Sequence, residues 1–413
     1  MVPAFSAGNF DVLMNVCDPE PAGMSRIWFR RPSVWYGVLC IVAVAAAAIW
    51  RSSALESPRP PGISSAEWTA AKEAAASRLR RAPAAAEVCL TLARKAIRDG
   101  QFETALVCFD AVTADDPDHG LQAMFERSSL LFDQSRAGEA EKGFQQILEA
   151  SRAGLAVPGR QRLYALRTLS LLYGVQMRTI QRAAILKQLM DARQADVHEA
   201  KYYFFPSLLV WQNDWGAARI REWLKHEPNS RPLQNADARY LIGEGQLEAA
   251  RERLEALYAA DSRDAETAAF LLECCREQND VPRFETICTE LPPESATEPL
   301  LLTEFRGIWL LDRKKWQQAQ ACFQRLLERD PANTAAWQGL ATCHGQLGQS
   351  EQRLQAIDRA AVLARLRVGL GPAAPENPEA IRAVADWCRQ LEMPDAAIAF
   401  DFFGSGRVQA DSQ

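Results

Sequence analysis

The sequence is poor in histidine and lysine, and it lacks the short motifs of several common catalytic centres. Four histidines occur in 413 residues, and only eight of the 47 basic residues are lysine. No GxSxG, GxxxxGK[ST], HExxH or CxxC pattern is present. These absences argue against serine hydrolases, P-loop nucleotide hydrolases and zinc peptidases. We therefore expect no catalytic, cofactor-binding or metal-binding residues.

The overall balance of residues is that of an ordinary folded protein. Hydrophobic residues make up 48% of the chain and charged residues 24%, with a net charge of −5. An acidic chain with a pI near 5.7 is not favoured as a nucleic-acid binder. A mean hydropathy of −0.21 argues against many membrane spans. The length exceeds that of one compact core, so we expect several domains or a repeat array.

One apolar stretch near the start predicts a membrane anchor. Residues 34–50 read VWYGVLCIVAVAAAAIW and carry no charge. As a helix they would extend about 25 Å, within the lower range for a spanning segment. Arg30 and Arg31 precede the stretch, so residues 1–33 are predicted to stay in the cytoplasm. Together with the arginine and alanine excess, which suggests a bacterial source, this predicts a single-pass inner-membrane protein whose remaining chain is extracytoplasmic.

Two other interpretations of this stretch stay open. Residues 43–48, AVAAAA, offer the small side chains that a signal peptidase needs, so the segment could be a cleaved signal peptide. It could also be a buried helix of a soluble domain. Residues 51–85 follow as a linker rich in proline, serine and alanine, which predicts a stalk and a lead-in helix.

An internal repeat begins after the linker. Ala93, Ala105, Phe109 and Pro117 are separated by the same spacings as a second set, which consists of Gly307, Ala319, Phe323 and Pro331. This spacing suits two helices that pack as a hairpin. A small residue on each helix permits close approach, the phenylalanine fills the gap to the next hairpin, and the proline ends the second helix.

The pattern resembles the tetratricopeptide repeat family, whose first-helix positions are matched by Trp337, Leu340 and Ala341. The resemblance implies an all-α fold, a right-handed α-solenoid of helix hairpins with a concave groove. We expect the solenoid to occupy 86–402, with a tail at 403–413. The pattern is clear in 86–154, 231–264 and 300–367, and it is degenerate in 160–228 and 265–298; residues 378–402 are predicted to form a last helix pair. The family's carboxylate clamp is not matched.

The ten cysteines show no spacing typical of a disulfide framework. Several fall at helical positions inside the repeats, where cysteine serves as a small apolar residue. Because an extracytoplasmic compartment oxidises exposed thiols, either these cysteines are buried or the predicted orientation is wrong.

Charge is distributed unevenly along the array. Residues 152–193 contain eight basic residues and one acid, whereas 237–304 contain 16 acids and six basic residues. The basic block predicts an exposed patch for an acidic partner, beside an aromatic cluster. The alternative is that the charges form only a solvated face and that most rings are core. The candidate partner-binding residues are Arg160, Arg167, Arg178, Arg182, Trp211 and Trp215.

Taken together, these features favour a non-enzymatic, membrane-anchored scaffold that binds protein or peptide partners and no nucleic acid. Two alternatives remain: an exported soluble binding protein released by signal cleavage, and an enzyme with its site in the divergent region 160–228.

Overall fold

The computed structural model describes the chain from residue 85 to residue 405 with short gaps. The described residues are 85–114, 116, 118–206, 214–295, 297–370 and 377–405. They belong to one compact unit that begins at Leu79. All their regular structure is helical, which confirms the all-α prediction for this part of the chain. The predicted anchor at 34–50 lies outside these residues. Within them, no helix has the length and apolar character needed to span a bilayer.

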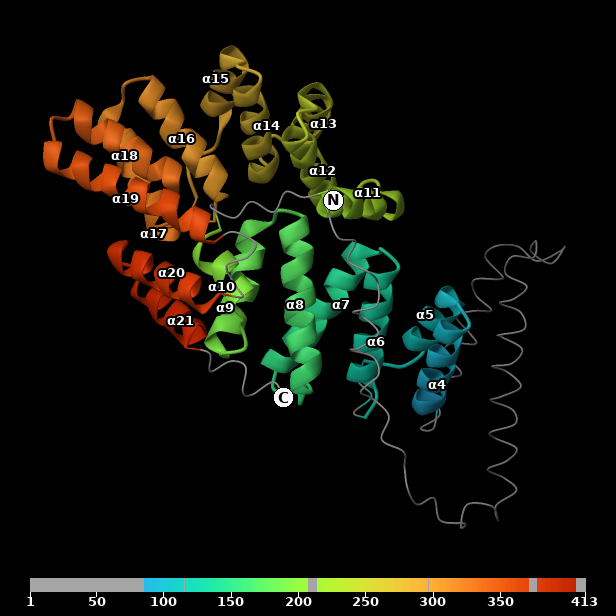
Figure 1. Cartoon of the computed structure of the whole chain (residues 1–413). Helices are drawn as coiled ribbons and strands as arrows, with labels where there is room; N and C mark the ends of the chain where they lie inside the picture. Colours follow the sequence, from blue (N-terminus) through green and yellow to red (C-terminus); the bar gives the residue numbers. More distant parts are fainter. Residues whose placement is uncertain are drawn as a thin grey trace, which may run out of the picture. The chain divides into compact units, whose positions relative to one another are not determined.

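The helices follow one another in pairs joined by short turns (Figure 1). The first half contains α4 (Ala85–Arg98), α5 (Phe102–Asp110), α6 (Gly120–Asp133), α7 (Ala137–Arg152), α8 (Gly159–Val175), α9 (Thr179–Asp191), α10 (Val197–Phe204) and α11 (Asp214–His226). The second half contains α12 (Arg231–Gly243), α13 (Leu247–Ala260), α14 (Ala265–Glu277), α15 (Val281–Glu290), α16 (Leu300–Asp312), α17 (Trp316–Arg329), α18 (Thr334–Gln346), α19 (Ser350–Gly369), α20 (Pro378–Gln390) and α21 (Pro394–Gly404). The predicted last helix pair is thus present as α20 and α21.

The turns inside the hairpins share one backbone conformation. Gly100 and Gly348 have φ of 73°. The backbone N–H of the residue after each glycine donates a hydrogen bond to a carbonyl oxygen in the preceding helix, that of Ala96 or His344. This is the Schellman ending, in which a left-handed residue lets the chain reverse after the helix. Ser135 and Lys314 also have a positive φ although they are not glycine. The turn geometry is therefore kept even where the preferred glycine is absent.

The small residues of the repeat lie at the helix crossings, as the spacing predicts. Ala105 and Ala319 are fully buried. A Cβ atom built on Gly307 of α16 would lie 2.5 Å from the Phe323 ring, and one on Gly339 of α18 would lie 2.4 Å from the same ring. Phe323 therefore fills the space between two successive first helices, and only glycine at both positions leaves room for it.

The central part departs from this scheme. Helix α10 begins with a capping box, in which Asp196 and Glu199 exchange side-chain-to-backbone hydrogen bonds of 2.8 Å, and it ends two residues before Pro206. Instead of forming a hairpin with α11, α10 packs on α9 and α21, and α11 packs on α8 and α12. The degenerate pattern at 160–228 thus coincides with altered packing.

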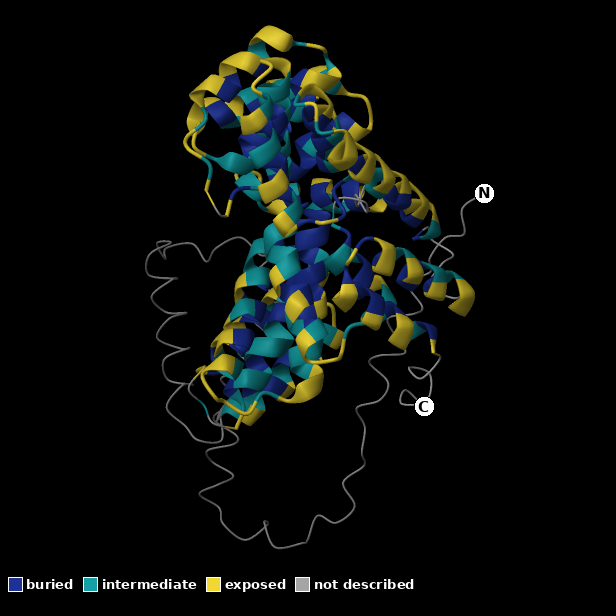
Figure 2. Cartoon of the chain, turned by 90° about the vertical axis from the view of Figure 1, so that its left-hand side faces the viewer, coloured by how far each residue is buried: buried dark blue, intermediate teal, exposed yellow. Residues whose placement is uncertain are grey.

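A second hydrophobic cluster joins α10 to the C-terminal hairpin. The rings of Phe205 and Phe400 stack with centroids 5.8 Å apart, and both side chains are fully buried. Lys201 of α10 is also buried, and its Nζ donates a 3.0 Å hydrogen bond to the carbonyl of Leu370. Buried residues run through the middle of the paired helices (Figure 2). The chain therefore brings its C-terminal hairpin back to its centre, which a linear array does not require.

All eight described cysteines are free, and seven of them are buried while Cys108 is half-buried. Cys274 and Cys275 are adjacent in α14 and form no disulfide. Burial raises the pKa of Cys274 to about 11 and that of Cys275 to about 12, so both are neutral thiols near pH 7. Their role as small apolar core residues agrees with the sequence prediction.

Candidate functional site

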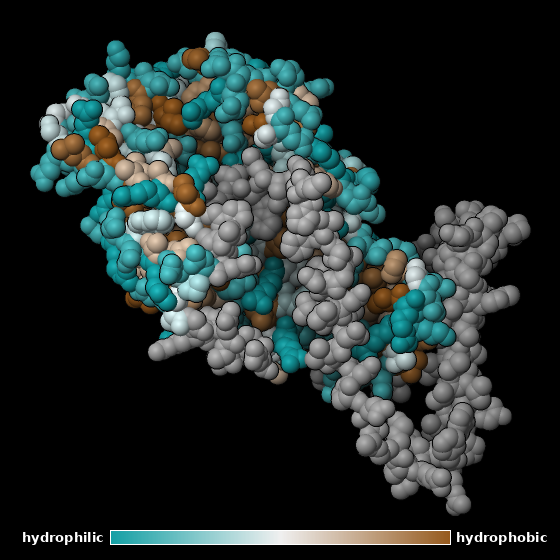
Figure 3. Space-filling model, in the orientation of Figure 1, coloured by the Kyte–Doolittle hydropathy of each residue, from teal (hydrophilic) through white to brown (hydrophobic). Residues whose placement is uncertain are grey.

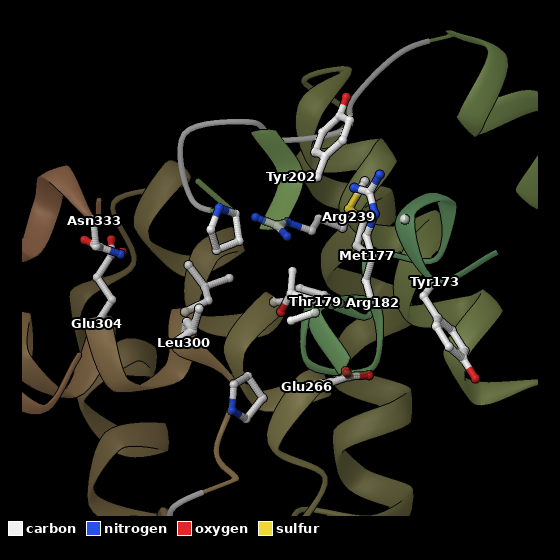
Figure 4. A pocket seen from close by; sticks show the side chains of 16 residues that line it. Tyr173, Met177, Thr179, Arg182, Tyr202, Arg239, Glu266, Leu300, Glu304 and Asn333 are labelled. Carbon is white, nitrogen blue, oxygen red and sulfur yellow. The ribbon is translucent and has the colours of Figure 1, made fainter. Parts of the chain in front are cut away.

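A cavity of about 260 Å³ lies where the central helices meet the first helices of the later hairpins (Figure 4). Helices α8, α9 and α10 contribute one group of lining residues, and α12, α14, α16 and the start of α18 contribute the other. The lining includes Tyr173, Met177, Thr179, Arg182, Tyr202, Pro206, Arg239, Glu266, Phe270, Leu300, Leu301, Glu304 and Asn333.

Arg182 of α9 lies along the cavity wall. Its guanidinium carbon is 3.8 Å from the centre of the Tyr202 ring, and the backbone of Gly174 approaches its other side. A Cβ atom on Gly174 would lie 2.9 Å from the guanidinium carbon, so glycine lets the side chain lie flat against α8. Burial lowers the pKa of Arg182 to about 10, and the group stays charged at neutral pH.

Arg239 of α12 is engaged by a neighbouring acid. Its guanidinium donates two hydrogen bonds to the Glu273 carboxylate, at 3.0 and 3.4 Å. The same group lies 5.0 Å from the centre of the Phe270 ring. These contacts fix the planar guanidinium at the cavity edge and balance its charge locally.

Two carboxyl groups line the cavity at separate places: Glu304 lies beside Asn333, and Glu266 lies on the side of Thr179 and Arg182 (Figure 4). Burial, with a smaller contribution from Asp264, raises the pKa of Glu266. Burial also raises the pKa of Glu304, whose Oε2 accepts a 3.2 Å hydrogen bond from Asn333 Nδ2. Asn333 is held in place because its Oδ1 caps α18 by accepting from the Ala336 N–H at 2.8 Å.

The remaining lining is apolar. Met177, Phe270, Leu300 and Leu301 supply methyl, methylene and ring surface between the charged groups. The cavity thus combines an apolar interior with convergent charged and amide groups, which suits the binding of a side chain or a short segment.

The sequence-predicted residues do not form one patch. Arg160 and Trp215 are exposed, and Trp211 lies outside the described residues. Arg167 is exposed and forms a 3.0 Å ion pair with Glu199. The predicted exposure is wrong for Arg178 and Arg182. The Arg178 side chain is only 15% exposed. Its Nη1 lies 2.7 Å from Oε2 of Glu141 in α7, a pairing that a count of charges along the sequence does not reveal.

Sequence reasoning missed the acidic side of the cavity. The sequence pattern places Glu266 and Glu304 only within the acidic block 237–304. A signal was nevertheless present: Glu266 and Phe270 lie one 34-residue repeat before Leu300 and Glu304. Superposing the first helices at that period would have placed these four residues on one face.

Comparison with known families agrees with the hairpin architecture. Two family profiles, both described as tetratricopeptide repeat, match the chain, one at residues 241–303 and the other at 90–154 and 306–378. The first includes part of the region that the sequence pattern left degenerate. No curated protein matches the chain.

Solved structures with detectable similarity share little sequence. A tetratricopeptide repeat protein from Parabacteroides merdae is 13% identical, with 62% of this chain and 98% of that one covered and a TM-score of 0.30. Human IFIT1, crystallised as a dimer with PPP-AAAA, is 14% identical, with 83% and 75% covered and a TM-score of 0.32. In the Cut9–Hcn1 complex, the matched chain is 12% identical, with 80% and 74% covered and a TM-score of 0.31. At such low scores only the family profiles bear on identity, and by them this chain contains tetratricopeptide repeats at residues 90–154, 241–303 and 306–378.

Proposed function

We propose that this protein is a non-enzymatic scaffold that holds a segment of a protein partner in the cavity between α8–α10 and the first helices of the later hairpins. The observation that carries the proposal is the composition of that cavity. Side chains from successive repeats converge on one apolar space with charged groups at its edge. Repeat domains of this kind generally bind protein partners through surfaces shared by several repeats.

Site-specific photo-crosslinking in the native cell tests this function. A photoreactive residue replaces Leu301, which lines the cavity, and in a matched variant it replaces Val107, which is 61% exposed on α5. We expect a discrete crosslinked partner from position 301 and none of the same mass from position 107. Identical products from both positions, or no product from position 301, would contradict the proposal.

Membrane anchoring is a separate part of the proposal, and it rests on the apolar residues 34–50 and the preceding arginines. A reporter that is active only outside the cytoplasm, fused after Ser57, should be active. An intact-mass measurement distinguishes an uncleaved anchor from a released soluble form. Activity of a cytoplasmic reporter alone would invert the proposed orientation.

A further inference from the structure

The cavity has two carboxyl groups that lack a cationic hydrogen-bond partner among the described residues. No described side chain donates a hydrogen bond to the carboxylate of Glu266, and that of Glu304 accepts one only from the neutral amide of Asn333. Both are half-buried, so water compensates their charge incompletely. The environment around each carboxylate favours a positive charge brought in from outside.

The two arginines that line the cavity already contact other groups. Arg239 is bound to Glu273 by two hydrogen bonds, and Arg182 lies between the backbone of Gly174 and the face of Tyr202. Arg178, which does not line the cavity, is paired with Glu141. Arg182 thus lies over Tyr202 and Arg239 beside Phe270. Among the described residues no arginine donates a hydrogen bond to Glu266, although the charge of Arg178 lowers its pKa and partly offsets the effect of burial.

We infer that the cavity binds a basic side chain of the partner segment, a lysine or arginine flanked by an apolar residue. The ammonium or guanidinium group lies against one of the two carboxylates, Glu266 or Glu304, and the aliphatic stem and apolar neighbour contact Met177, Leu300 and Leu301. Long basic side chains suit this arrangement because their stems are apolar and only their tips are charged. The inference rests on the proposed function and adds the chemistry of the partner.

The charge of the surrounding helices agrees with this choice. The lining residues Arg239 of α12, Glu266 and Phe270 of α14, and the start of α16 lie in the block 237–304, which has 16 acids and six basic residues. The face seen in Figure 3 is mostly hydrophilic, with apolar residues in small separate groups. A surplus of negative charge around a partly apolar cavity accelerates the approach of a cationic segment. This reverses the sequence-based expectation of an acidic partner.

Peptide binding to the full chain tests the inference. The probes are fluorescent acetylated peptides of equal length whose central residues are Leu-Lys-Leu, Leu-norleucine-Leu or Leu-Glu-Leu. Norleucine keeps the aliphatic stem and removes the charge. We expect the lysine peptide to bind at least about tenfold more tightly than the other two, because it alone pairs with one of the half-buried carboxylates.

The variants Glu266→Gln and Glu304→Gln isolate the charge, and Glu277→Gln is the matched control. Glu277 is an exposed acid of α14 that does not line the cavity. The variant at the carboxylate that holds the cation should weaken binding of the lysine peptide about tenfold and leave binding of the norleucine peptide unchanged, whereas the control should leave both unchanged. A thermal melt checks that each variant is folded.

Some outcomes overturn the inference alone. These are equal or better binding of the glutamate peptide, no binding of the lysine peptide, or two cavity variants that both behave like the control. A partner segment crosslinked from position 301 that contains no basic residue also overturns it, while the scaffold function stands. Absence of that crosslink overturns the function itself.

Discussion

The hairpins α16–α19 and the central helices α8–α11 show two ways in which one chain builds a core. In α16–α19, contacts join successive helices, and Phe323 lies between glycines of α16 and α18. In the centre, α10 contacts the C-terminal α21, and Trp223 of α11 is fully buried among helices of earlier hairpins. The first region is held by neighbours in sequence, and the second by distant segments.

The difference shows where repeat spacing constrains a sequence. Small residues are required at fixed intervals only where helices cross at the standard distance. Where a helix packs on a distant segment, large aromatic residues take over, as Phe205 does against Phe400. A degenerate repeat pattern can therefore indicate a change of packing partner and not a loss of structure.

The largest expected effect is in the regular region. Phe323→Ala should lower the free energy of unfolding by about 3–5 kcal/mol. The ring fills the space between Gly307 and Gly339, and these glycines have no side chains that could fill the cavity left behind. Chemical denaturation measures the loss. Hydrogen exchange should rise mainly in α16, α17 and α18. A loss below about 1 kcal/mol would show that these helices collapse together more readily than their geometry suggests.

Phe205→Ala should cost somewhat less, about 3 kcal/mol, because the ring lies at the end of α10 beside a chain connection. Its distinguishing result is the location of the effect. Hydrogen exchange should rise both in α10 and in α20–α21, although these elements are far apart in sequence. An effect confined to α10 would remove the contrast between the two regions.

The regular region could be predicted from sequence to the level of single residues. Ala319 and Phe323 meet partners in the same or the adjacent hairpin, so the 34-residue spacing already encodes their contacts. The cavity could not be predicted in the same way. It requires Tyr202 of α10 to lie near Glu266 of α14 and also near Leu300 of α16. Neither relation has a fixed spacing in the chain.

The variant Ala319→Leu tests whether the two helices of this hairpin cross at Ala319. The larger side chain should cost about 1–3 kcal/mol by overpacking, because Ala319 is fully buried. Ala364→Leu in α19 is the matched control, since Ala364 is exposed, and it should be nearly neutral. Equal denaturation midpoints for the two variants would place the crossing elsewhere.

Glu266→Gln should slightly stabilise the unliganded protein near neutral pH, with a rise in Tm of about 1–2 °C. Burial and Asp264 raise the folded-state pKa of this carboxyl, while Arg178 acts in the opposite direction. A raised folded-state pKa means that the ionised group disfavours folding, fully so above that pKa. The gain should therefore disappear as the pH falls below the ordinary carboxyl range. Melting curves across that pH range measure it, and a constant difference would contradict the assignment.

Arg167→Gln should have the smallest effect, within about 0.5 kcal/mol. Arg167 is 45% exposed, and its ion pair with Glu199 is open to water. A larger loss in a denaturation experiment would show that this pair supports the capping box of α10 and would make the central region more dependent on charge than on aromatic packing.

The bond from Lys201 to Leu370 joins positions 169 residues apart. An open repeat array can fray from either end, one hairpin at a time, because each unit touches only its neighbours. Here α21 of the last hairpin also packs on α10, through Phe400 and Phe205, so fraying from the C-terminal end must also break contacts of α10. A protease that removes residues from the C-terminal end would therefore cause a single cooperative step. In that step α10 loses its contacts with α21, and the cavity loses the part of its wall that α10 provides.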